Sequence, residues 1–117
     1  MKDEEMAKLR KILDQPLNEE VGNVIAKQLS ECEAWSARVS YAYRIALQDL
    51  YRARRNALLP KDRTYTELDR TTRLEADTSE FQFRADVLKD LQEILKRRIS
   101  LGQSILKSLM VEVEARV

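Results

Sequence analysis

The sequence contains no histidine and a single cysteine, Cys32. Without histidine the chain cannot supply the imidazole that serves as a general base, as the centre of a catalytic triad or as a metal ligand. One cysteine allows neither an internal disulfide nor a cage of thiolates around a metal ion. Most familiar active-site chemistry is therefore excluded, and we expect a protein that is not an enzyme and holds no metal or cofactor.

Glycine and proline are scarce as well, with two of each among 117 residues. A protein built from β-sheets needs these residues at its turns, so their scarcity argues against one. Charged residues make up 35% of the chain and hydrophobic residues 44%. Such a mixture is typical of long helices with one apolar stripe and many exposed charges, and it predicts an all-α fold.

Long apolar runs are also missing. No stretch approaches the roughly 20 apolar residues of a membrane-spanning helix. The N-terminus, Met1-Lys2-Asp3-Glu4-Glu5, is charged and lacks the apolar run of a signal peptide. We therefore expect a soluble cytoplasmic protein with no membrane partner.

Two short segments, each with one proline, interrupt the helical pattern. Pro16 disfavours helix at the residue before it, and Asn18 is suited to cap a helix that begins at residue 19. Pro60 lies in the second break, where Thr64 and Glu67 have the spacing of a capping box. We predict a single helical domain over 1–117, with helices at about 2–14, 19–59 and 65–115.

The two long predicted helices each carry an apolar seam in alternating steps of three and four residues. In the first it consists of Ile25, Leu29, Cys32, Ser36, Val39, Tyr43, Ala46, Leu50, Ala53 and Ala57. In the second it consists of Leu74, Thr78, Phe81, Ala85, Leu88, Gln92, Leu95, Ile99, Gly102, Leu106, Leu109 and Val113. Heptad seams joined by a short link predict a long antiparallel, coiled-coil-like helical hairpin with its tip at about residues 59–64.

The last helix carries a second apolar stripe, mostly in its C-terminal half. Its members are Val87, Leu91, Ile94, Leu101 and Ile105. Two adjacent stripes make a face too wide for one partner helix. The N-terminal helix offers Met6, Leu9, Ile12 and Leu13, with Leu17 beyond it. It is expected to pack at the base of the hairpin and cover about half of this face. We predict that the stripe is an interface of a homo-oligomer, and the alternative is a monomeric three-helix bundle with a thicker core.

The net charge is +1, but the charge is distributed unevenly. Residues 38–73, with 9 basic and 4 acidic side chains, form the only basic region. The cations that flank the predicted tip are Arg52, Arg54, Arg55, Lys61, Arg63, Arg70 and Arg73. Because guanidinium groups near tyrosines such as Tyr51 and Tyr65 suit phosphate contacts and base stacking, the segment predicts binding of DNA or RNA. The alternative is an ordinary solvated helix face.

Several other residues are expected to have structural roles. Trp35, Tyr41 and Tyr43 should pack with their polar ends near water. Cys32 lies on the seam, so it is predicted to be an inert core residue. Gly102, within a helix, costs about 1 kcal/mol relative to alanine, which predicts a close helix contact there.

Two pairs of acidic residues have a spacing that could suit a magnesium site. Asp77 and Glu80, like Asp90 and Glu93, are three residues apart and share a helix face. All-α nucleotide pyrophosphatases use such pairs, but they also need an acidic cluster on the neighbouring helix. No such cluster is present, so these carboxylates are expected to face solvent.

Three runs between Ala42 and Leu109 form one layout along the predicted hairpin. They are Tyr43-Arg44 followed by Tyr51-Arg52-Ala53-Arg54-Arg55, then Phe83-Arg84-Ala85-Asp86, then the stretch from Arg97 to Lys107. In this layout the chain resembles small helical proteins that bacteriophages encode beside recombination and replication genes. The resemblance implies a phage protein in the host cytoplasm, with a non-enzymatic accessory role on nucleic acid or on a protein that processes it. The alternative is an anti-CRISPR-like inhibitor that binds a host defence nuclease without contacting nucleic acid.

Overall fold

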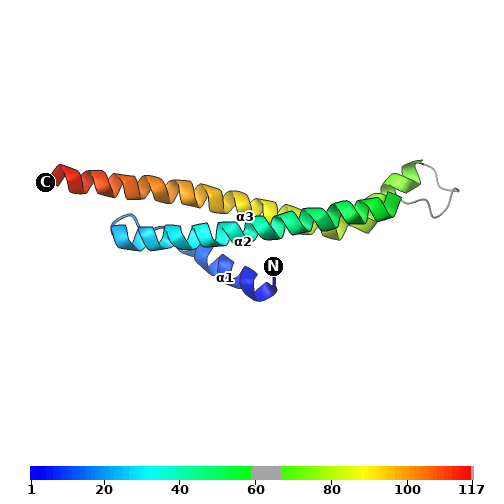
Figure 1. Ribbon diagram of the computed structural model, residues 1–117, viewed down its shortest axis with the longest axis horizontal. Coiled ribbons are helices and arrows are strands. Elements are labelled where there is room, and N and C mark those ends of the chain that lie inside the picture. The colour runs from blue at the N-terminus through cyan, green and yellow to red at the C-terminus, as the bar shows by residue number, and fades with distance from the viewer. Residues whose placement is uncertain (59–66, 117) are drawn as a thin grey trace. The chain divides into compact units, whose positions relative to one another are not determined.

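The computed structural model describes residues 1–58 and 67–116, and their side chains except those of residues 58, 67–71 and 116. Three helices account for most of these residues, and no strand occurs among them. They are α1 (Asp3–Asp14), α2 (Gly22–Leu58) and α3 (Glu67–Arg116) (Figure 1). The predicted all-α class is confirmed. The predicted hairpin tip at 59–64 lies outside the described residues.

The segment between α1 and α2 is held by the side chain of Asn18. Its Oδ1 accepts hydrogen bonds from the backbone N–H groups of Glu20, at 2.9 Å, and Val21, at 2.7 Å. These bonds close a turn ahead of the helix, so α2 begins at Gly22 and not at residue 19 as predicted. The Asn18 N–H in turn donates to Gln28 Oε1 at 2.8 Å, which ties the turn to the second turn of α2.

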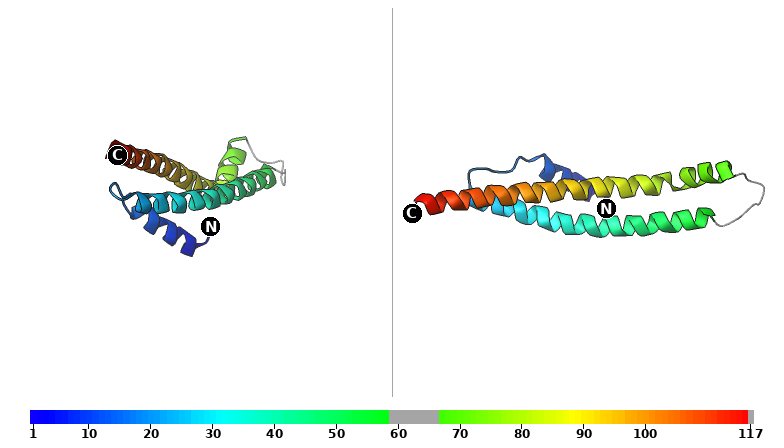
Figure 2. Two further views of the ribbon diagram at one scale, coloured as in Figure 1. Left: turned by 60° about the vertical axis from the view of Figure 1, so that its left-hand side comes forward. Right: turned by 90° about the horizontal axis from the view of Figure 1, so that it is seen from above.

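The chain divides into two compact units, and α2 and α3 run through both. The first unit comprises Met1–Val39 with Leu91–Val117, and the second comprises Ser40–Asp90. Within each unit α2 and α3 lie side by side and run in opposite directions (Figures 1 and 2). Every predicted seam residue of α2 is buried or half-buried. The same holds for every predicted seam residue of α3 from Leu74 to Leu109. These contacts fit the predicted antiparallel hairpin.

The core of the first unit joins all three helices. Its buried members are Leu9, Cys32, Trp35, Val39 and Leu95. Leu9 is fully buried, and Ile12 and Leu13 of the same helix pack against this cluster. The predicted packing of the N-terminal helix is therefore confirmed, as is the burial of Cys32.

At Gly102, α2 and α3 pack tightly against each other in the first unit. A Cβ atom added there would lie 2.5 Å from Leu29 Cδ2 and 3.6 Å from Ile25 Cδ1. The close helix contact predicted at this glycine is confirmed, because any larger residue would have to displace the buried Leu29 side chain.

The core of the second unit contains several small side chains. Among the described residues of this unit, the buried ones are Ala46, Leu50, Thr78, Ala85 and Leu88. The hydroxyl of Thr78 donates to the carbonyl of Leu74 at 2.6 Å, so its burial leaves no unpaired donor. Because two of the buried residues are alanines, the side chains impose little separation on the two helices.

Candidate functional site

The structure places the predicted basic residues in different surroundings. Arg52 and Arg55 are exposed on α2, whereas Arg54 donates a hydrogen bond of 2.6 Å to Gln82 Oε1 of α3. Arg73 is exposed on α3. The side chains of Lys61, Arg63 and Arg70 lie outside the described residues. A basic site at the hairpin tip as a whole thus remains a prediction, while its α2 portion can be located.

In the second unit, α2 presents a face of exposed tyrosine and arginine side chains. We call it the Tyr–Arg face, and its members are Tyr41, Arg44, Gln48, Tyr51, Arg52 and Arg55. They follow one another at helical spacing on the side of α2 opposite the buried Ala46 and Leu50. Tyr41 is 66% exposed and Tyr51 is 59% exposed, so most of each ring is accessible to a ligand.

The Tyr–Arg face carries three arginines and no acidic side chain among its own members. The nearest acidic residue of α2 is Asp49, which is half-buried on the flank of the helix. Arg84 and Glu80, both on α3, form an ion pair, whereas Arg44, Arg52 and Arg55 form none with another described residue. The charge of these three arginines is therefore available to an external anion.

Sequence reasoning found only half of this face. Tyr41 was expected to pack, and that expectation is wrong, because the ring lies three residues before Arg44 on the solvent side of α2. Trp35 does pack, at 8% exposed, with the Arg38 guanidinium 5.0 Å from its ring centroid. Tyr43 is half-buried. The sequence did indicate that Tyr41 is exposed. At 100° per residue around the helix axis, Tyr41 lies well away from the predicted seam.

The acidic residues do not gather into a metal site in the described part of the chain. Asp77, Glu80, Asp90 and Glu93 are all exposed, as predicted. Within that same part, no group of three or more His, Cys, Asp or Glu side chains is arranged to hold a metal ion.

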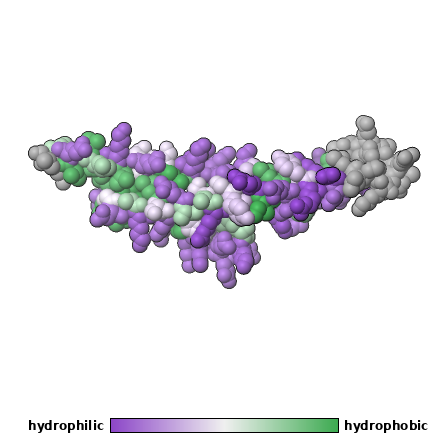
Figure 3. Space-filling view, in the orientation of Figure 1, coloured by the Kyte–Doolittle hydropathy of each residue, from purple (hydrophilic) through white to green (hydrophobic). Residues whose placement is uncertain are grey.

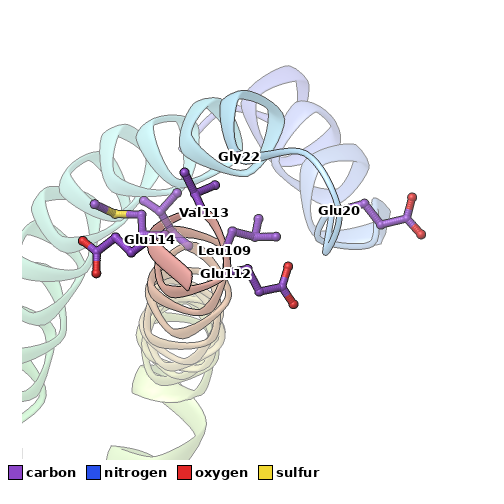
Figure 4. A pocket seen from close by; sticks show the side chains of 8 residues that line it. Glu20, Gly22, Leu109, Glu112, Val113 and Glu114 are labelled. Carbon is purple, nitrogen blue, oxygen red and sulfur yellow. The ribbon is translucent and has the colours of Figure 1, made fainter. Parts of the chain in front are cut away.

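The first unit carries shallow cavities along the C-terminal part of α3. One of about 460 Å³ lies where α2 begins, and its apolar lining includes Leu106, Leu109 and Val113. Figure 4 shows the carboxylates of Glu112 and Glu114 directed to opposite sides of α3, away from Leu109 and Val113. Hydrophobic surface is visible over this part of α3 in Figure 3.

The residues of the predicted oligomer stripe differ in how far they are buried. Leu91 packs against the core cluster of the first unit, and Val87 is half-buried in the second unit. Ile94 is 45% exposed, Leu101 is 58% exposed, and Ile105 is half-buried. α1 thus covers only part of the stripe, and the exposed remainder lies in the first unit.

Arg98, which interrupts the stripe, is used within the chain. Its guanidinium donates to the backbone carbonyls of Leu13, at 3.4 Å, and Gln15, at 2.5 Å. These carbonyls lie at the C-terminal end of α1, where a cation is favoured by the helix dipole. Arg98 therefore fastens α1 to α3 in the first unit.

None of the three helices, over the residues that are described, is both long enough and apolar enough to cross a membrane. Comparisons of the chain with models of protein families, with curated proteins and with solved structures find no match.

Proposed function

We propose that this protein is a non-enzymatic accessory protein of the bacteriophage type that binds nucleic acid through the Tyr–Arg face of α2. The observation that carries the proposal is the coincidence of two highly exposed tyrosines with three unpaired arginines on one side of a helix. Either residue type alone is common on a helix surface. Together, on a face with no acidic residue, they match the two chemical features of a nucleic-acid strand.

Each component of the face has a distinct role. The guanidinium groups of Arg44, Arg52 and Arg55 form charge-assisted hydrogen bonds with phosphate oxygens. The rings of Tyr41 and Tyr51 offer flat surfaces on which unpaired bases stack. Since stacking needs bases that are free of a duplex, a single strand is the preferred ligand.

The dimensions of the face agree with a short stretch of strand. Arg44 and Arg55 are eleven residues apart, which is about 16 Å along a helix. At the spacing of about 3.4 Å per nucleotide that one strand has in a duplex, this length corresponds to about five nucleotides, and a more extended single strand would place fewer nucleotides along it.

Salt dependence gives a quantitative test. Three phosphate contacts to a single strand predict a slope of about −2 for the logarithm of the association constant against that of salt concentration. Raising the salt from 50 to 200 mM should then weaken binding about 20-fold. The measurement is fluorescence anisotropy with labelled single-stranded and duplex oligonucleotides of DNA and RNA.

Matched variants locate the site. Changing Arg44, Arg52 and Arg55 together to Gln should abolish salt-sensitive binding. Changing Lys8, Lys96 and Lys107 to Gln removes the same charge from exposed positions of the first unit and should leave most binding intact. Equal loss in the two triple variants would show that net charge alone is responsible and would contradict the proposal.

Variants of the two tyrosines distinguish base stacking from attraction by charge alone. Tyr41→Ala or Tyr51→Ala should weaken single-strand binding by about 5- to 150-fold each, whereas Tyr→Phe, which keeps the ring, should be nearly neutral. If none of the four nucleic acids binds even at low salt, the proposal fails, and a protein partner such as a host defence nuclease becomes the function to test.

A further inference from the structure

A groove in the first unit runs along the exposed part of the α3 stripe. It consists of two adjoining cavities of about 330 and 270 Å³, which share Glu19 and Ile105 in their linings. Its floor on α3, the α3 groove face, comprises Ile94, Arg97, Leu101, Ile105, Ser108 and Glu112. Its opposite wall is the segment that contains Leu13, Pro16 and Leu17.

The shape and composition of the groove favour a helix as its occupant. The α3 groove face follows steps of three and four residues, which is the spacing with which one helix presents a stripe to another. Its apolar members Ile94 and Leu101 remain about half exposed in the single chain. A second helix lying along α3 would remove these side chains from water.

The charges on this face identify which helix fits. Arg97 lies near one end and Glu112 at the other, and both are exposed. They are fifteen residues apart, or about 22 Å along α3, with Ser104 and Ile105 midway between them. A two-fold axis through this midpoint places the cation of each copy opposite the anion of the other, so the face is complementary to itself.

We propose that the α3 groove face is the interface of a homodimer in which the α3 helices of two copies pack antiparallel, with the two-fold axis between Ser104 and Ile105. Arg97 then faces the partner's Glu112, and Leu101 faces the partner's Ser108. A parallel arrangement would instead oppose like charges at both ends. The small Ser104 and Ser108 near the axis let the helices approach closely.

This dimer is independent of the proposed nucleic-acid role, because the Tyr–Arg face belongs to the second unit. Light scattering should give a mass of twice the 13.7 kDa of one chain. The triple Gln variant of the Tyr–Arg face should keep that mass, so failure of one proposal is distinguishable from failure of the other. A monomeric mass at all protein concentrations up to 100 μM would overturn the dimer.

Charge exchange tests the ion pairs across the axis. Arg97→Glu places like charges opposite each other and should raise the dimer dissociation constant by at least about tenfold. Adding Glu112→Arg to the same chain restores opposite charges and should return the dissociation constant to near its original value. Lys107→Glu, at an exposed position on another side of α3, is the control and should have little effect. A double variant that dimerises no better than Arg97→Glu would overturn the antiparallel pairing.

Disulfide trapping tests the register. Leu101→Cys and Ser108→Cys should cross-link when the two variants are mixed, since the two positions face each other across the interface. Neither variant alone should cross-link, because equivalent positions are then about 10 Å apart along the axis, beyond the reach of a disulfide. Cys32 is fully buried and does not compete. Cross-linking of each variant alone would indicate parallel helices and would overturn the proposed arrangement.

Discussion

Replacing Gly102 by alanine should destabilise the protein, although alanine is the better helix former. Without other effects the change would stabilise a helix by about 1 kcal/mol. Here the new methyl group would lie 2.5 Å from Leu29 Cδ2 and 3.0 Å from Leu29 Cγ. Since both atoms are too close and Leu29 is only 7% exposed, the whole side chain must shift within a packed contact.

The magnitude follows from the two opposing effects. Overpacking of a well-packed core costs about 1–3 kcal/mol. When the gain in helix propensity is subtracted from this cost, Gly102→Ala should lower the free energy of unfolding by about 1 kcal/mol. In urea denaturation followed by circular dichroism, with protein concentration held fixed, this corresponds to a midpoint lower by about 0.5 M.

A double-mutant cycle isolates the cause. Leu29→Ala alone should cost about 2–5 kcal/mol, because it empties a buried site. In that background Gly102→Ala meets no obstruction and should stabilise by about 1 kcal/mol, so its effect changes sign. Gly22→Ala is the matched control, because nothing lies within 4 Å of a Cβ added there and α2 should tolerate it. Additivity within about 0.5 kcal/mol, or a stabilised single variant, would refute the reasoning.

Two further predictions concern the attachment of α1 and the start of α2. Arg98→Met keeps the length of the side chain but removes both hydrogen bonds to the end of α1. Amide hydrogen exchange in α1 should therefore accelerate about 5- to 30-fold. In the control variant Lys96→Met, the exchange rates in α1 should stay unchanged. Asn18→Ala removes the acceptor of the turn before α2 and should cost about 1 kcal/mol in urea denaturation. Asn18→Asp, which keeps an acceptor oxygen, should be much milder; an equal loss in both variants would show that the turn bonds contribute little.

The seams were predictable because they depend on local periodicity. Steps of three and four residues placed Leu29, Val39 and Leu50 on one side of α2, and all three are buried. The same stepping failed at its end, where Val113 is 62% exposed. Because α2 begins only at Gly22, its side chains do not extend along α3 far enough to cover that last position.

The candidate surfaces were less predictable, since exposure depends on what lies across space. Leu91 and Ile94 belong to one stripe in the sequence, yet Leu91 packs against the core cluster while Ile94 is 45% exposed. Periodicity alone cannot show how far a twelve-residue helix reaches over such a stripe. Tyr41 is a different case, because its angular position on α2, well away from the seam, already indicated that the ring is exposed.

The sequence by itself determined that the chain is helical, that it breaks between α1 and α2, and which side of α2 and which side of α3 carry the apolar seam. These properties follow from the composition of the chain and from two local features, Pro16 and the heptad spacing. Both local features act over one or two helical turns. Only the tertiary structure decided that Gly102 fits against Leu29, that Arg98 binds the end of α1, and that the Tyr–Arg face and the α3 groove face stay open. Such features arise between residues far apart in the chain, because a contact across two helices depends on their separation and register, which no local pattern specifies.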